Sequence, residues 1–186
     1  LGMSVRTLGA LVERFGLHGQ QLGEVAMGAV IKHPSDWNLG REAALSSGLS
    51  PLTPGITLQR ACGTSLDTLI LVANKIALGQ IDAGIGGGSD TTSDVPIVYG
   101  KQLRSRLLAA NRAKSTGDKI KALLSGFRFS ELKPEFPGVA EPRTGKSMGD
   151  HCEDMAKEWN ISRDSQDEWA VSSHKKLAAA YERGFF

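Results

Sequence analysis

Residues 1–90 alternate between segments with helical periodicity and short apolar runs rich in strand-forming residues, and no other feature restricts the fold as strongly. Apolar residues recur at helical spacing from Val5 to Phe15, and the run GEVAMGAVI (Gly23–Ile31) follows as a predicted strand. The stretch NLGREAALSSGL predicts a second helix, and a second strand is expected from Ile56 to about Ala61. This alternation predicts an α/β fold in which helices pack on both faces of a mixed, mainly parallel sheet.

The most regular helical pattern begins directly after Cys62. Apolar residues there stand at i, i+3, i+4, i+7, i+10 and i+11, which is the best amphipathic stripe in the chain, and Gly79 closes the helix. The next run, IDAGIGGGSD, is predicted to be a buried strand that enters a glycine-rich turn. The stripe consists of Leu66, Leu69, Ile70, Ala73, Ile76 and Ala77.

The segment from about Val98 to Pro142 differs in character, because it is basic, weakly periodic and holds three of the seven prolines. We interpret it as an excursion from the sheet, and its Lys and Arg residues as a solvated face rather than a binding site. The expected division is a strand-and-helix domain over residues 1–100 and a helical excursion over residues 101–186.

Two helices are predicted beyond the basic segment. The first carries an apolar face from Met148 to Trp159, with Ser147-x-x-Asp150 as a capping box at its start. The second runs from about Arg163 to Arg183, with Ser162 as its N-cap and Gly184 as the stop signal.

Composition excludes several classes of protein. The formal net charge of +2 over 186 residues does not indicate a nucleic-acid partner, and no apolar stretch approaches the ~20 residues of a membrane span. Cys62 and Cys152 are far apart and form neither a disulfide framework nor a zinc-type pair. No signal-peptide pattern is present, but the chain starts at Leu1 inside a helical pattern, so we expect a leading segment, and any targeting signal with it, to be missing.

Cys62 is the strongest candidate for chemistry in this sequence. It stands where a strand gives way to a helix, so its sulfur would lie near unpaired helix N–H groups, which favour a thiolate. The alternative, a small buried apolar cysteine, remains open on spacing alone. Cys152 lies on the apolar stripe of a helix, which favours a structural role. No histidine is close to Cys62 in sequence and no metal-binding pattern exists, so the residues supply a nucleophile without an evident base.

Two long segments resemble the thiolase family. The first, QRACGTSLDTLILVANKIALGQIDAGIGGGSDTTSDVP, resembles the thiolase pattern of a cysteine before glycine that opens a buried helix, followed by a glycine-rich strand end. The second, MGDHCEDMAKEWNISRDSQDEWAVSSHKKLAAAYERGFF, resembles the thiolase segment with Met-Gly, a Glu-x-x-Ala helix and a closing Gly-Phe. Together with GREAAL they cover most of the chain in the family's order. The resemblance implies a thiolase-like fold, of which this chain is the N-terminal half, without its opening strand, and part of the loop domain.

The resemblance also implies roles for single residues. Cys62 would carry the acyl group as a thioester, and Met148 would lie against the pantetheine or acyl end of coenzyme A. Ser147 stands where some biosynthetic thiolases carry His, which looks more like the fatty-acid-degrading branch, and it is the other candidate substrate-binding residue. Gly87 and Gly88 match a structural glycine pair. Asp90 stands where the family commonly has Glu and is assigned no chemistry.

By the same resemblance, the expected reaction is thiolytic cleavage of a 3-ketoacyl-CoA or the reverse Claisen condensation. Coenzyme A would be a substrate and no cofactor is expected. The family's activating histidine, oxyanion motif and second cysteine come from a later half, so this chain resembles a fragment that would be inactive alone. The resemblance further implies a homodimer or homotetramer, association with other β-oxidation enzymes, and a cytoplasmic location if the source is bacterial, an organelle remaining open.

Two alternatives stand beside this expectation, one a different enzyme and the other a binding protein. A ketoacyl synthase relative would share the fold and the cysteine but takes carrier-bound substrates, and the ISR..QD..A..SH segment argues against it. A non-catalytic acyl-CoA or lipid-binding thiolase-like protein would have no reason to keep a thiol at position 62.

Overall fold

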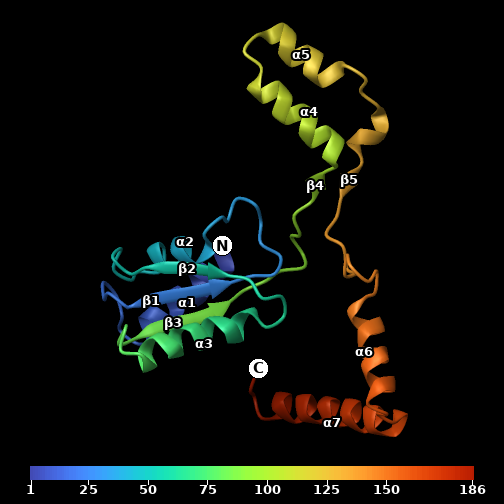
Figure 1. Ribbon diagram of the computed structural model, residues 1–186. Coiled ribbons are helices and arrows are strands. Elements are labelled where there is room, and N and C mark those ends of the chain that lie inside the picture. Colours follow the sequence, from blue (N-terminus) through green and yellow to red (C-terminus); the bar gives the residue numbers. More distant parts are fainter. The chain divides into compact units, whose positions relative to one another are not determined.

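The computed structural model describes residues 1–186, which form two compact units, Leu1–Pro137 and Gly138–Phe186 (Figure 1). Helices and strands alternate through the first part of the larger unit, as the sequence predicts. The elements of the larger unit are α1 (Gly2–Arg14), β1 (Glu24–Gly28), α2 (Leu39–Leu45), β2 (Gly55–Leu58), α3 (Thr64–Ala77), β3 (Gly84–Gly88), β4 (Val98–Tyr99), α4 (Lys101–Arg112), α5 (Thr116–Leu124), the 3₁₀ helix η1 (Phe129–Leu132) and β5 (Pro134–Glu135). The smaller unit contains α6 (Met148–Glu158) and α7 (Arg163–Glu182).

A three-stranded parallel sheet forms the centre of the α/β part, in the order β2-β1-β3. Ala26 of β1 lies opposite Ile56 of β2 on one side and Gly86 of β3 on the other. The predicted α/β class with a mainly parallel sheet is confirmed. A separate antiparallel pair, β4 with β5, closes the base of the basic segment.

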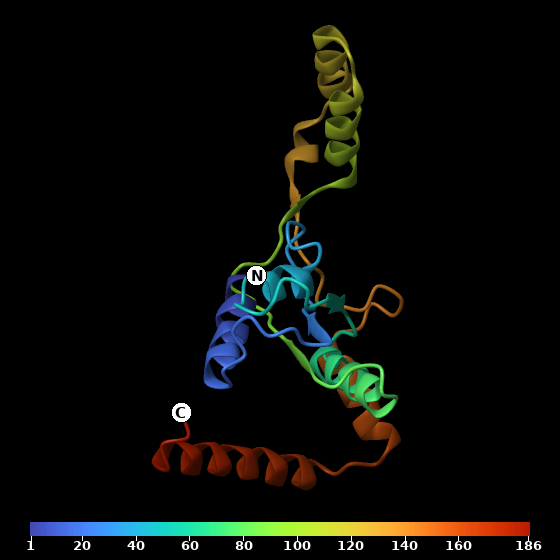
Figure 2. The same cartoon turned by 90° about the vertical axis from the view of Figure 1, so that its left-hand side faces the viewer.

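The two faces of the sheet are covered by different helices. Alternate residues of a strand point to opposite faces, so Val25 and Met27 lie on one face and Ala26 on the other. The first face packs against α1 and α2, whereas α3 contacts β1 and β3 from the opposite face. Figure 2 shows α1 and α3 on opposite sides of the strands. The apolar core of the first face consists of Leu8, Val12, Val25, Met27, Ala43, Ala44 and Leu49.

The glycines of β3 allow α3 to lie unusually close to the sheet. A Cβ atom on Gly86 would stand 2.9 Å from the backbone nitrogen of Leu69, and a Cβ on Gly28 would stand 2.1 Å from Cγ2 of Thr64. No larger residue fits at such positions without moving the helix. The strand expected within IDAGIGGGSD is confirmed and extends through Gly84–Gly88, so the turn begins later than the glycine run suggests.

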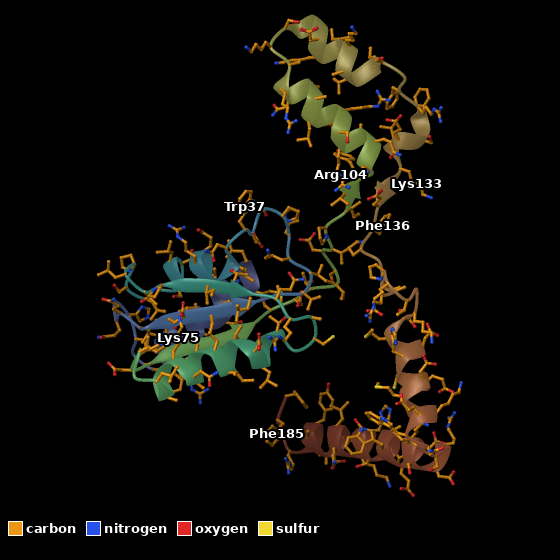
Figure 3. All side chains as sticks on the ribbon, viewed as in Figure 1. Trp37, Lys75, Arg104, Lys133, Phe136 and Phe185 are labelled. Atoms are coloured by element: carbon orange, nitrogen blue, oxygen red, sulfur yellow. The ribbon has the colours of Figure 1, made fainter.

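The face of α3 that meets the sheet is not its apolar stripe. Thr64, Thr68 and Val72 are the buried residues of this helix, and Lys75 forms an ion pair with the buried Glu24 (Figure 3). In contrast, Leu66 is 63% exposed and Leu69 is 51% exposed. Small residues face the sheet because the close approach leaves no room for leucine or isoleucine. All six residues of the stripe are exposed.

Two predicted strands end earlier than their apolar runs suggest. The run expected to reach Ile31 leaves the ladder after Gly28, because the N–H groups of Val30 and Ile31 donate to the carboxylate of Asp90 instead, each over 2.7 Å. The strand expected to reach Ala61 ends at Leu58. Ala61 itself adopts a positive φ of 40°, which a ladder does not accommodate.

The basic segment folds as a helical hairpin around one arginine. Arg106 of α4 binds both carboxylate oxygens of Glu131, at 2.6 Å and 3.1 Å, and also donates to the carbonyl groups of Ser125 and Gly126. These contacts join α4, the end of α5 and η1. The other basic side chains of α4 and α5 are exposed, as expected for a solvated face.

Both predicted N-caps of the smaller unit are confirmed. The Ser147 hydroxyl accepts from the Asp150 N–H, and the Asp150 carboxylate accepts from the Ser147 N–H, which is the expected capping box. Ser162 caps α7 in the same way. The prediction that Cys152 is a buried structural residue is wrong, because its side chain is exposed together with the apolar stripe of α6.

Candidate functional site

Cys62 lies in the connection between β2 and α3, two residues before the helix begins. Tight hydrogen bonds shape this connection: the Gly63 N–H donates to the Arg60 carbonyl over 2.9 Å, and the Thr64 hydroxyl donates to the Ala61 carbonyl over 2.7 Å. The same hydroxyl accepts from the Arg60 N–H. The turn therefore holds the backbone on both sides of Cys62 while its thiol stays exposed.

In a parallel sheet the strands all end at the same edge. Cys62, which follows β2, therefore lies at the same edge as the loops that follow β1 and β3. Asp90, after β3, holds Val30 and Ile31, after β1, through their N–H groups. Gln59, after β2, donates to the Val30 carbonyl over 3.3 Å. The loop after β1 is thus bound from both neighbouring strand ends.

The sequence carries only an indirect signal for this role of Asp90, an acidic residue shortly after a glycine-rich strand. The N–H groups that it binds lie 59 and 60 residues earlier in the chain. Its carboxylate has a structural function here.

In the first unit, no basic side chain is hydrogen-bonded to the thiol of Cys62. His33 contacts Ser35, and His18 lies against Gly48, so neither imidazole engages the thiol. No group of three or more His, Cys, Asp or Glu side chains gathers as a metal site. The long, apolar helix that crossing a bilayer requires is also absent from the structure. The arrangement provides an accessible thiol just before the start of a helix, a group that is able to accept an acyl chain.

Ser147 and Met148, the other predicted site residues, belong to the smaller unit. Ser147 is the N-cap of α6 and Met148 is its first residue, with a side chain that is 63% exposed. Both cysteines are exposed, so exposure does not distinguish Cys62 from Cys152. Their positions do, since Cys62 precedes the first turn of its helix whereas Cys152 lies within α6.

Fold and site together define a parallel α/β domain with an exposed cysteine at the strand-to-helix connection beside its central strand. The family model described as "Thiolase, N-terminal domain" matches residues 2–186. The chain belongs to the thiolase family.

Several bacterial relatives are similar to nearly the whole chain. A protein of Photorhabdus laumondii named 3-ketoacyl-CoA thiolase is 41% identical over 184 residues, which are 99% of this chain and 42% of that protein. Proteins of the same name from Pectobacterium carotovorum and Yersinia pestis are 41% and 39% identical over 94% of this chain and 40% of their own length. The chain thus spans about two fifths of the length of these relatives.

Proposed function

We propose that this chain is part of a thiolase that exchanges acyl groups between 3-ketoacyl-CoA and coenzyme A through an acyl-enzyme on Cys62. The observation that carries the proposal is the exposed thiol at the start of α3, in a chain that belongs to the thiolase family. The relatives' name, 3-ketoacyl-CoA thiolase, supports the substrate class.

The proposed reaction has two steps. The Cys62 thiolate attacks the 3-keto carbonyl carbon, the bond between C2 and C3 breaks, and the electron pair leaves with acetyl-CoA as an enolate that is protonated at C2. A second coenzyme A thiolate then attacks the acyl-enzyme and releases the Cys62 sulfur. The same steps in reverse are a Claisen condensation. Coenzyme A is a substrate throughout and no cofactor takes part.

Ser147 and Met148 are proposed to contact coenzyme A or the acyl chain. Met148 offers an exposed, flexible thioether at the start of α6, a side chain that adapts to apolar ligands. We place the general base and the oxyanion hole in parts of the protein outside residues 1–186, because in the first unit no imidazole or carboxylate is hydrogen-bonded to Cys62.

The exposed apolar stripe of α3 supports the proposal that a further layer of the whole protein covers this helix. A stripe of leucine and isoleucine is poorly tolerated in water, and we propose that the rest of the chain packs on it. We further propose a homodimer or homotetramer, a cytoplasmic location, and association with other β-oxidation enzymes. Sedimentation of the full-length protein at micromolar concentration should give more than one chain per particle, and a mass of one chain would contradict the proposed assembly.

The test uses full-length protein, the Cys62→Ser variant and the matched Cys152→Ser variant. Loss of the magnesium–enolate absorbance of acetoacetyl-CoA, or of a longer 3-ketoacyl-CoA, is followed with free coenzyme A. We expect Cys62→Ser to lower turnover by about 10³-fold or more, and Cys152→Ser to keep the wild-type rate. Residues 1–186 alone should show no turnover. Cleavage that survives in Cys62→Ser would overturn the assignment.

A further inference from the structure

Residues 140–147 form a small hairpin directly before α6, here named the pre-α6 hairpin. Ala140 and Ser147 pair as an antiparallel bridge, and the Glu141 N–H donates to the Lys146 carbonyl over 2.8 Å. The Gly145 N–H donates to the Glu141 carbonyl over 2.8 Å, and Gly145 has a positive φ of 70°. The hairpin therefore sets where Ser147, and with it Met148, stands.

Side chains attach this hairpin to the first turns of α6. Glu141 accepts from the Thr144 hydroxyl over 2.8 Å, and its Oε2 lies 3.2 Å from Nε2 of His151. Nε2 of His151 is also 3.2 Å from the Thr144 hydroxyl. Lys146 forms an ion pair with Asp154 one turn further along the helix.

Glu141 is the centre of this arrangement. It is the acceptor for the hydroxyl of Thr144, the guanidinium of Arg143 and the imidazole of His151. The Thr144 hydroxyl holds the pKa of Glu141 below its usual range, with the His151 imidazole as a further cause. Both Glu141 and His151 are about one-third exposed, so the contact is partly shielded from water.

We propose that Glu141 and His151 form a clamp that positions Ser147 and Met148 for binding acyl-CoA. This inference rests on the proposed function, because only that function gives Met148 a ligand. Glu141 is a positioning residue in this scheme: it contacts His151 and the hairpin, and acts on the substrate through the start of α6.

The charges around His151 favour this contact. Three carboxylates face the imidazole, those of Glu141, Asp150 and Asp154, and the cations nearby are Lys146 and Arg143, each already engaged with a carboxylate. A hydrogen bond to an ionised carboxylate is stronger than one between neutral groups. Removing the charge of Glu141 should therefore loosen the clamp.

The experiment compares full-length wild type with Glu141→Gln, which keeps the size and the hydrogen-bonding oxygen but removes the charge. Glu158→Gln is the matched control, since Glu158 is an exposed residue of the same helix with no side-chain hydrogen bond or ion pair in the structure. We expect Glu141→Gln to raise KM for the 3-ketoacyl-CoA about 3-fold, with kcat within about 2-fold. Glu158→Gln should leave both KM and kcat unchanged.

Hydrogen exchange separates this inference from the proposed function. Amide exchange of residues 141–149 should be faster in Glu141→Gln than in wild type at pH 6, whether or not the protein cleaves 3-ketoacyl-CoA. Unchanged exchange would overturn the clamp. Faster exchange with an active enzyme and an unchanged KM would overturn its positioning role, and an inactive wild type with faster exchange would remove the proposed function while leaving the clamp.

Discussion

Gly86 and Gly87 are adjacent residues of β3 with opposite surroundings. A Cβ on Gly86 would meet the backbone of α3 at 2.9 Å, whereas a Cβ on Gly87 would have only Sδ of Met27 within 4 Å, at 3.8 Å. The difference arises because alternate residues of a strand point to opposite faces. One glycine is required by packing and its neighbour is not.

We therefore expect Gly86→Ala to destabilise the protein by about 1–3 kcal/mol, because the helix backbone must shift to admit the methyl group. Gly87→Ala is the matched control and should change stability by less than about 1 kcal/mol. Thermal unfolding of both full-length variants measures the difference. Equal melting temperatures would contradict the close packing of α3 on β3.

Among candidate site residues, the position of Cys62 between a strand and a helix could be predicted from the sequence because its signal is local. A cysteine before glycine, between a strand and a helix, needs no knowledge of distant residues. Asp90 could not be recognised, since its partners Val30 and Ile31 become neighbours only when β1 and β3 pair. The expectation that Cys152 is buried was wrong for a related reason: an apolar stripe on a helix does not show which element covers it.

At the level of elements, the helical hairpin of the basic segment depends on Arg106. Its guanidinium is the common donor for the Glu131 carboxylate and for the two carbonyl groups at the end of α5. Arg104, on the same helix, is exposed and forms no side-chain hydrogen bond or ion pair in the structure (Figure 3). Two arginines two residues apart thus have different functions, one structural and one solvated.

Arg106→Lys should loosen this hairpin, because an ammonium cannot bind both carboxylate oxygens and two carbonyl groups at once. We expect amide exchange of residues 125–131 to become about 5-fold faster or more at pH 7. Arg104→Lys is the matched control and should leave exchange unchanged. The idea fails if the two variants behave alike.

The same contact predicts a dependence on pH. Arg106, chiefly through its hydrogen bonds, lowers the pKa of Glu131 below the ordinary value for glutamate. A lowered pKa in the folded state means that the contribution to stability is complete above the ordinary pKa and is lost as pH falls through the lowered one. The difference between wild type and Arg106→Lys should accordingly shrink in acid.

At the scale of the whole molecule, α3 carries small and polar residues toward its own sheet and an apolar stripe away from it. A helix of this kind has two packing faces, and the sheet satisfies only one. Members of the thiolase family such as the Photorhabdus relative are longer than this chain, which covers 42% of that protein. The stripe is the surface on which we expect the remaining residues to pack.

The double variant Leu66→Gln, Ile70→Gln tests this expectation in two settings. In residues 1–186 alone, it should raise the soluble fraction, because it removes exposed apolar area. In the full-length protein it should lower stability by about 3 kcal/mol or more, since burying each such side chain contributes about 1.5–3 kcal/mol. Asn74→Gln, also exposed on α3, is the matched control. A full-length protein unaffected by the double variant would mean that the stripe stays exposed.

The sequence by itself determined most helices and strands of residues 1–90 and the two C-terminal helices, because helical periodicity, the caps at Ser147 and Ser162, and strand-forming runs act over a few residues. It also singled out the strand-to-helix position of Cys62, for the same reason. Only the tertiary structure decided which face of α3 meets the sheet. That choice depends on how closely two backbones approach, and here the approach is set by glycines of β3 rather than by the apolar stripe of the helix. Local patterns show how hydrophobic a helix face is, but the space between the backbones determines which face packs against the sheet.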